Sequence, residues 1–217
     1  MTKIKICGLC REEDIDAANE AGPDFIGLVF APSRRRVDFS TAAKLRSRLA
    51  EGITPVGVFA DTPAADVAAL FRDGVIRMAQ LHGAEDAAYI ASLRALCPVP
   101  VIGALRAGSA VSGAPDFARG PRGCAFLPDY FLLDAAAPGS GEAFDWKTLD
   151  DPALRREGPL LGGKPWFLAG GLGLHNIDAA LALGPWGVDL SSGAETGGAK
   201  DRAKMIALVS RVHGAFC

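Results

Sequence analysis

The sequence contains little that would place the protein in a membrane or on a nucleic acid. It has no run near the roughly 18 apolar residues that a membrane helix needs, and no apolar segment of the signal-peptide type opens the chain. The formal net charge is only -2, which gives no electrostatic reason to expect a nucleic-acid partner. We therefore expect a cytoplasmic protein with no membrane and no nucleic acid among its partners.

Cysteine is sparse, and an odd number without a secretion signal argues against a disulfide framework. The five residues are Cys7, Cys10, Cys97, Cys124 and Cys217. A zinc site is disfavoured because no second pair of Cys or His with ligand spacing follows Cys7 and Cys10, and we expect no metal. These two cysteines do form a C-x-x-C pair between a predicted strand and a predicted helix. That pattern keeps a thiol–disulfide oxidoreductase open as an alternative.

Strand-length apolar runs alternate with alanine-rich helical segments along the whole sequence, of which 49% is hydrophobic. In the first run Lys and Ile alternate over residues 3–6, and Gly8 ends the strand after Cys7. The predicted strands cover residues 3–7, 25–30, 54–59, 78–81, 99–105, 130–133, 166–169 and 187–190.

The number of these units predicts the fold. Eight β-then-α units of about 27 residues each match an α/β protein, a single (β/α)8 TIM barrel over residues 1–217. An open doubly wound sheet is disfavoured because its first loop would carry G-x-G-x-x-G, which residues 7–10 do not. Residues 107–123 are rich in Gly, Ala and Pro and predict a degraded helix or loop after strand five.

Capping residues predict where several helices begin. Ser40 is the expected N-cap of a helix that runs through residue 49. Thr62 and Pro63 stand in the favoured cap-then-proline order, and Asp86 is expected to cap the next helix. A short helix is expected over residues 146–156.

In a (β/α)8 barrel the chemistry lies where the strands end, at the C-terminal face. The polar residues predicted there are Cys7, Arg35, His82, Arg106, Asp134 and Asp189. Strands one and six are three steps apart around the ring, so Cys7 and Asp134 should face each other across the barrel mouth. This separation suits an acid and a base that act on two parts of one substrate. It does not suit a nucleophile–base dyad, whose members must touch.

Two glycine-rich loops follow the last two strands, at the place where many barrels bind phosphate with backbone N–H groups. One contains Gly171 and Leu172, and the other contains Ser192 and Gly193. We expect a phosphate between the two backbones. The alternative is that both loops are simply tight turns.

Five motifs, in the right order and spread over nearly the whole chain, resemble the phosphoribosylanthranilate isomerase family. They are Lys-Ile-Cys-Gly-Leu at 5–9, Gln-Leu-His-Gly at 80–83, Leu-Leu-Asp at 132–134 with Gly-Ser-Gly at 139–141 and Phe-Asp-Trp at 144–146, Ala-Gly-Gly-Leu at 169–172, and Val-Asp-Leu-Ser-Ser-Gly-Ala-Glu at 188–195. The resemblance implies the barrel fold and an enzyme of tryptophan biosynthesis.

The resemblance also implies a reaction without a cofactor, the Amadori rearrangement of N-(5-phosphoribosyl)anthranilate, a phosphorylated aminoaldose, to 1-(2-carboxyphenylamino)-1-deoxyribulose 5-phosphate. Asp134 would be the acid that helps to open the furanose ring, and Cys7 the base that takes the C2 proton. Arg35 would pair with the anthranilate carboxylate, which suits a planar guanidinium, and Asp189 would bind a ribose hydroxyl. We expect a monomer.

Each assignment has a structural alternative. Cys7 is otherwise a buried thiol, Asp134 a turn carboxylate, Arg35 a solvated loop arginine and Asp189 a structural strand-end carboxylate. His82 is expected to pack or to fix a loop rather than to catalyse.

The proposed roles set requirements on two pKa values. An acid at position 134 needs a pKa well above the ordinary aspartate value of about 3.9. A thiol of pKa about 8.5 is only a few per cent thiolate at pH 7, so a lowered pKa would help Cys7. The basic loop at residues 33–36 is a candidate source of that lowering.

The sequence departs from the family pattern at a few positions. Cys10 replaces a Thr, which predicts a weaker cap for the first helix. Arg34 and Arg35 follow Ser33 where the family has Ser-Pro-Arg, so the arginine assignment carries a one-residue risk of register. Pro138 replaces a Gly, and Gly103 replaces a Lys.

Two other functions remain open at this point. One is the thiol–disulfide oxidoreductase built on Cys7 and Cys10, which explains neither glycine-rich loop. The other is a protein that binds a sugar phosphate without turning it over.

Overall fold

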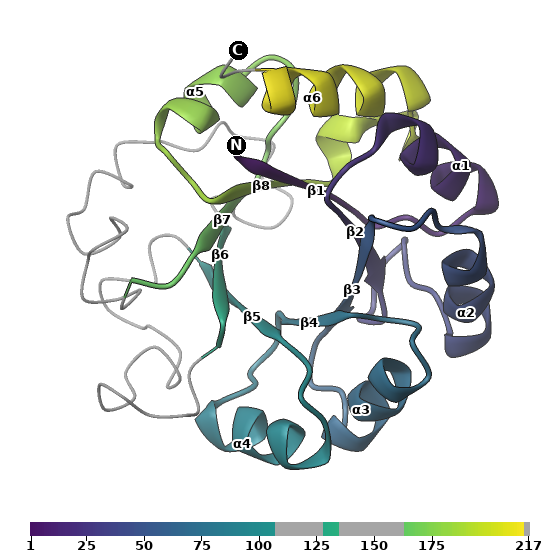
Figure 1. The fold of residues 1–217 in the computed structure, drawn as a ribbon, viewed down its shortest axis with the longest axis vertical. Coiled ribbons are helices and arrows are strands. Elements are labelled where there is room, and N and C mark those ends of the chain that lie inside the picture. Colours follow the sequence, from purple (N-terminus) through teal and green to yellow (C-terminus); the bar gives the residue numbers. More distant parts are fainter. Residues whose placement is uncertain (107–127, 135–162, 215–217) are drawn as a thin grey trace.

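A computed structural model describes residues 1–106, 128–134 and 163–214. Eight parallel strands close into one barrel in the order β1-β2-β3-β4-β5-β6-β7-β8, with helices around the outside (Figure 1). The strands are β1 (Lys3–Cys7), β2 (Phe25–Val29), β3 (Thr54–Phe59), β4 (Met78–Leu81), β5 (Val101–Arg106), β6 (Tyr130–Asp134), β7 (Trp166–Ala169) and β8 (Gly187–Leu190). The (β/α)8 fold predicted from the eight units is confirmed, and all eight strands match their predicted positions to within two residues at each end.

Helices follow most strands and cover the outer face of the barrel. Those described are α1 (Glu12–Ala21), α2 (Phe39–Arg48), α3 (Ala64–Arg72), α4 (Ala87–Leu96), α5 (Ile177–Ala182) and α6 (Arg202–Gly214). The predicted degraded segment at 107–123, the predicted helix at 146–156 and the motif residues 139–146 lie outside the described residues. Among the helices that the structure describes, none is long and apolar enough to cross a membrane.

Helix starts were predicted less well than strands. Asp38, not Ser40, caps α2, because its carboxylate accepts from the backbone N–H of Thr41 at 2.7 Å and Ser40 already lies in the first turn. The N-cap of α3 is Pro63 rather than Thr62. Asp86 caps α4 as predicted, accepting from the N–H of Tyr89 at 2.8 Å.

The N-cap of α1 is Arg11, whose side chain makes no capping hydrogen bond, in agreement with the weaker cap expected from Cys10. The Asp14 carboxylate, inside the helix, accepts from the backbone N–H groups of Cys10 at 3.0 Å and Arg11 at 3.1 Å. It also pairs with the Arg11 side chain. The N–H of the N-cap Arg11, which a helix leaves without an intrahelical partner, is satisfied in this way, together with the N–H of the residue before it.

Two layers of apolar side chains form the core. Ile4 and Ile6 of β1 face the helices and pack with residues such as Ala18 and Met205. A second cluster, made only of strand residues and Trp186, fills the barrel interior. The alternation of Lys and Ile in β1 therefore separates a helix-facing face from an interior face, and Lys5 on the interior face is fully buried.

Candidate active site

Cys7 ends β1 at the C-terminal end of the barrel, which we call the mouth. It is 9% exposed and packs with Val29 and Val58. The neighbouring strand leaves room for it at Gly27, where a Cβ would lie 2.6 Å from Cys7 Sγ and 3.0 Å from its Cα. The thiol therefore fits against a strand position that only glycine can occupy without displacing it.

The surroundings of Cys7 raise its pKa in the free protein. Burial is the largest cause, and Asp189 adds to it, whereas Lys5 and Lys200 act to lower the pKa. The lowered pKa that would help Cys7 as a base is not found in the free protein, because desolvation of the thiolate outweighs the neighbouring cations. The cations do reduce the cost of forming the thiolate.

Lys5 and Asp189 form a buried ion pair next to Cys7. Lys5 Nζ lies 3.0 Å and 3.1 Å from the two carboxylate oxygens, and the two residues are register partners on β1 and β8. Burial alone would lower the pKa of Lys5, but Asp189 and Cys7 more than offset it, so that the pKa is raised. Lys5 is thus an ammonium held inside the barrel, a residue to which sequence reasoning gave no role. The alternation of Lys3 and Lys5 with Ile was the available signal.

Asp134 ends β6, three strands from Cys7 along the order β1-β8-β7-β6. His82 lies beside it, with His82 Nε2 3.7 Å from Asp134 Oδ2, and Gln80 Nε2 lies 3.1 Å from His82 Nδ1. His82, expected to pack or to fix a loop, is thus a neighbour of the candidate acid. The structure places Cys7 and Asp134 on strands that end at the same mouth.

The two glycine-rich loops after β7 and β8 lie against each other. A Cβ on Gly193 would be 1.8 Å from the carbonyl oxygen of Leu172 and 2.9 Å from Gly173 Cα. Asn176 holds the first loop by accepting from the N–H of Gly173 at 2.9 Å and donating to the carbonyl of Gly171 at 3.1 Å. Sequence reasoning placed these loops together, and the close backbone approach explains why position 193 is a glycine.

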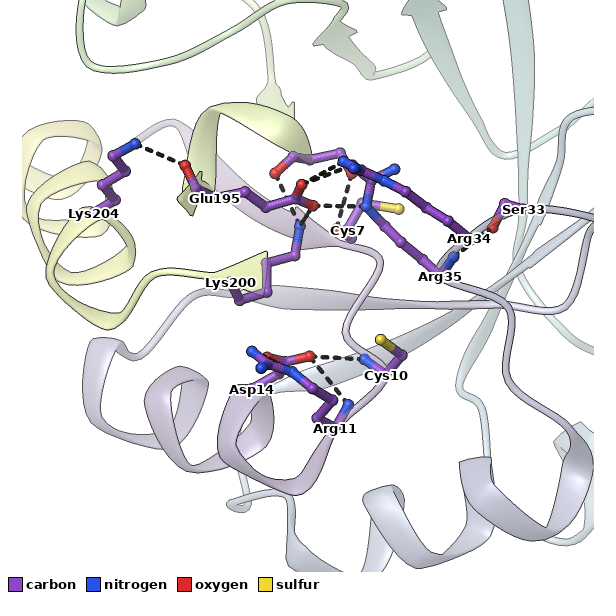
Figure 2. Close-up of polar contacts among 11 residues, drawn as sticks. Cys7, Cys10, Arg11, Asp14, Ser33, Arg34, Arg35, Glu195, Lys200 and Lys204 are labelled. Atoms are coloured by element: carbon purple, nitrogen blue, oxygen red, sulfur yellow. Dashed lines mark hydrogen bonds and ion pairs between the residues drawn. The ribbon is translucent and has the colours of Figure 1, made fainter. Parts of the chain in front are cut away.

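Arg35 reaches a carboxylate to which the sequence analysis gave no role. Its Nε and Nη2 donate to Glu195 Oε1 at 2.6 Å and Oε2 at 2.9 Å. Arg34 Nη2 donates to Oε2 at 2.7 Å, and Lys200 Nζ donates to Oε1 at 2.8 Å. We call Arg34, Arg35, Glu195 and Lys200 the Glu195 cluster, which lies beside Cys7 (Figure 2).

Burial and pairing oppose each other within the Glu195 cluster. Burial would raise the pKa of Glu195, but hydrogen bonds from Arg35 and Lys200 outweigh it and lower the pKa. For Lys200 burial dominates and lowers the pKa despite the carboxylate. Glu195 was visible in the sequence as the last residue of the 188–195 motif, but its arginine partners, Arg34 and Arg35, lie about 160 residues away.

The oxidoreductase alternative does not fit this arrangement. Cys7 packs with interior strand residues, whereas Cys10 packs against the outer, helix-facing cluster. Both are free thiols, and the pKa of Cys10 is raised, chiefly by burial. The fold is a closed barrel rather than a thioredoxin fold. In the described part of the chain no three Cys, His, Asp or Glu side chains gather as a metal site would require.

The closed barrel, with a thiol and a carboxylate on strands that end at its mouth and glycine-rich loops after β7 and β8, places the chain in the class of (β/α)8-barrel enzymes. The comparisons make this specific. Residues 4–211 match the family described as N-(5'phosphoribosyl)anthranilate (PRA) isomerase, and the chain belongs to this family.

Relatives along the full length agree with the family. The N-(5'-phosphoribosyl)anthranilate isomerases of Endomicrobium trichonymphae and Lactiplantibacillus plantarum are both 41% identical to the chain. The match to the first relative covers 96% of this chain and 97% of that relative. The match to the second covers 98% of this chain and 93% of that relative.

Solved structures also match over the whole barrel. TrpF from Jonesia denitrificans has a TM-score of 0.80 and 35% identity, covering 100% of this chain and 99% of that one. Phosphoribosyl anthranilate isomerase from Thermus thermophilus has a TM-score of 0.76 and 32% identity, covering 99% and 100%. A third structure, 25% identical with a TM-score of 0.76 and the same coverage as the second, is a phosphoribosyl anthranilate isomerase in complex with reduced 1-(o-carboxyphenylamino)-1-deoxyribulose 5-phosphate.

Proposed function

We propose that this chain catalyses the Amadori rearrangement of N-(5-phosphoribosyl)anthranilate to 1-(2-carboxyphenylamino)-1-deoxyribulose 5-phosphate in tryptophan biosynthesis. The observation that carries the proposal is the placement of Cys7 and Asp134 three strands apart at one barrel mouth. An acid and a base at that separation can act on the ring oxygen and on C2 of one sugar. The reaction moves protons within the substrate and needs no cofactor.

The proposed chemistry has two proton transfers. Asp134 donates a proton to the furanose ring oxygen as the C1–O bond breaks, which leaves an iminium ion at C1. Cys7, as the thiolate, then removes the proton from C2. The C2–H electrons form the C1–C2 double bond while the C1=N π electrons return to nitrogen, which gives an enaminol. Tautomerisation of this enaminol gives the ketone at C2.

The raised pKa of Cys7 in the free protein is compatible with this role. The iminium ion brings a positive charge next to the thiol just when the base is needed, and an adjacent cation favours a thiolate. The buried ammonium of Lys5 also favours the thiolate form of Cys7. A neutral thiol in the resting protein is also less open to oxidation.

Three contacts are proposed to hold the substrate. Backbone N–H groups of Gly171, Leu172, Ser192 and Gly193 bind the phosphate between the two loops, and Arg35 binds the anthranilate carboxylate. Asp189 binds a ribose hydroxyl. Since Lys5 already donates to both Asp189 oxygens, such a hydroxyl would share an acceptor that is held in place.

We also propose that the chain acts as a monomer in the cytoplasm. The related structures include monomers derived from a dimeric enzyme of Thermotoga maritima, so both states occur among relatives. In our assignment the substrate site is complete at one barrel mouth, because all the binding and catalytic residues named above belong to one chain.

The experiment that tests the proposed function is a fluorescence assay that follows consumption of N-(5-phosphoribosyl)anthranilate by the purified protein. We expect turnover without added metal or cofactor. Tight binding of the substrate without turnover would instead favour the sugar-phosphate-binding alternative.

A further inference from the structure

We propose that Glu195 is a positioning residue that holds Arg35 in one orientation beside Cys7 and so determines which edge of the guanidinium meets the substrate carboxylate. The inference rests on the proposed function, in which Arg35 binds that carboxylate. It concerns a residue to which the mechanism above assigns no role.

Glu195 is itself held from several sides. It is 8% exposed and begins β9 (Glu195–Thr196). This strand comes directly after the 3-10 turn η4 (Ser192–Ala194) of the glycine-rich loop that follows β8. β9 pairs with β10 (Ala199–Lys200), with Glu195 opposite Lys200. The carbonyl of Glu195 accepts from Lys204 Nζ at 2.7 Å. A carboxylate fixed in this way is a rigid acceptor.

The bond to Arg35 uses one defined edge of the guanidinium. Nε and Nη2 donate side by side to the two oxygens of Glu195, the two-pronged geometry that a planar guanidinium favours. Among the side chains that the structure describes, Glu195 is the only acceptor of the Arg35 guanidinium. The edge that carries Nη1 is left for a second carboxylate.

The stem of Arg35 is fixed as well. A Cβ on Gly8 would lie 2.3 Å from Arg35 Cδ, so the stem lies directly on the backbone that follows Cys7. The side chain is 20% exposed, and Figure 2 shows Arg34 and Arg35 reaching Glu195 past Cys7. Arg35 therefore bridges the loop after β2 to the loop after β8 directly beside the candidate base.

Charge within the Glu195 cluster favours a further anion. Arg34, Arg35 and Lys200 contribute three positive charges and Glu195 one negative charge, which leaves two positive charges. Glu195 thus orients the cations without neutralising them all. An arginine that is already ordered loses less side-chain entropy when it binds a ligand.

Two roles for Glu195 predict opposite results. If it positions Arg35, its loss weakens binding of a carboxylate ligand, because the guanidinium is no longer held. If it competes with the ligand for Arg35, its loss strengthens binding. The variant Glu195→Gln keeps the size of the side chain and removes the charge, so the sign of the change decides between them.

The test measures binding by calorimetry, which needs no turnover. The probes are reduced 1-(2-carboxyphenylamino)-1-deoxyribulose 5-phosphate and the same compound without its carboxyl group. We expect E195Q to weaken binding of the first ligand by about three- to tenfold. The affinity for the second ligand should stay within about twofold of the wild-type value. In the double variant with Arg35→Ala, E195Q should add nothing, since both act through one contact.

Two further variants complete the experiment. Arg35→Lys keeps the charge but not the fork, and should bind the carboxylate ligand as weakly as Arg35→Ala. Arg36→Ala, which removes an exposed charge from the same loop, is the matched control and should leave both affinities unchanged. If E195Q fails to fold, Arg35→Lys keeps the proposal falsifiable, because a lysine that binds the carboxylate ligand like the wild type would show that a fixed guanidinium fork is not needed.

The proposal is overturned if E195Q binds the carboxylate ligand more tightly than the wild type does, or if Arg35→Lys binds it as tightly as the wild type. It is also overturned if the wild type binds both ligands with equal affinity, or binds neither of them. A wild type that binds the carboxylate ligand selectively but does not turn over the substrate would count against the proposed function alone.

Discussion

At the scale of single residues, the environment of Cys7 sets two opposing demands. A general base has to lose its proton, yet burial at the end of β1 raises the pKa of the thiol. Lys5, Lys200 and the incoming iminium ion all favour the thiolate. We infer that the thiol remains protonated in the free protein and ionises efficiently only when substrate is bound.

Placement of the thiol depends on Gly27. We predict that Gly27→Ala lowers kcat by about a hundredfold, because the added Cβ would lie 2.6 Å from Cys7 Sγ and must displace it. The measurement is steady-state turnover together with urea unfolding, in which a loss of about 1–3 kcal/mol is expected for an overpacked site. Gly214→Ala meets nothing within 4 Å and is the control. Normal kcat in Gly27→Ala would show that the thiol does not need this position.

At the scale of elements, the loops after β7 and β8 form one unit through the contact between Gly193 and Leu172. We predict that Gly193→Ala raises the inhibition constant of inorganic phosphate and the substrate KM by at least about tenfold. A Cβ 1.8 Å from the Leu172 carbonyl must separate the two backbones. Competitive inhibition by inorganic phosphate measures the effect. Unchanged inhibition would place the phosphate elsewhere.

The elements also explain what could be predicted from the sequence. The strands were predictable because buried parallel strands are apolar throughout, as residues 25–29 are. The helix starts were less so, because Asp38 and Ser40 are both acceptable caps and only the backbone path selects one.

The residues of the site divide in the same way. The position of Cys7 and Asp134 at one mouth was predictable because the fold places all strand ends there, whereas their roles as base and acid stay predictions. The pairing of Arg35 with Glu195 was not, since it joins loops that are far apart in the sequence. Burial decides whether the Cys7 pKa rises or falls, and sequence spacing does not report burial.

At the scale of the whole molecule, closure of the barrel brings the two ends of the chain together. β1 pairs with β8 as well as with β2, and α1 packs on α6. Asp24 links these parts, because it accepts from Lys3 Nζ at 2.7 Å, from the Ile4 N–H at 2.9 Å, and lies 3.0 Å from His213 Nε2 of α6.

We predict that Asp24→Asn lowers the free energy of unfolding by about 1–2 kcal/mol at pH 7. Burial would raise the pKa of Asp24, but bonds from Lys3, His213 and Ile4 outweigh it and lower the pKa. The stabilisation is therefore present above the unfolded-state pKa of about 3.9 and lost as pH falls through the lower folded-state value.

Denaturant unfolding of the wild type and of Asp24→Asn as a function of pH measures the contribution of the Asp24 carboxylate. The difference in the free energy of unfolding between the wild type and Asp24→Asn should be present at about pH 5 and above and should narrow as the pH falls below about 4. Asp16→Asn, which breaks an exposed pair with Arg48, is the control and should change stability little. A difference that is unaffected by acid would mean that the ion pair does not link the chain ends.

The central claim is that Cys7 and Asp134 act as separate base and acid, and the kinetics of Cys7→Ala and Asp134→Ala test it most directly. We predict that each variant lowers kcat for N-(5-phosphoribosyl)anthranilate by roughly 10² to 10⁴, with little change in KM, because the phosphate and carboxylate contacts that carry most of the binding remain. Near-normal kcat in either variant would contradict the account.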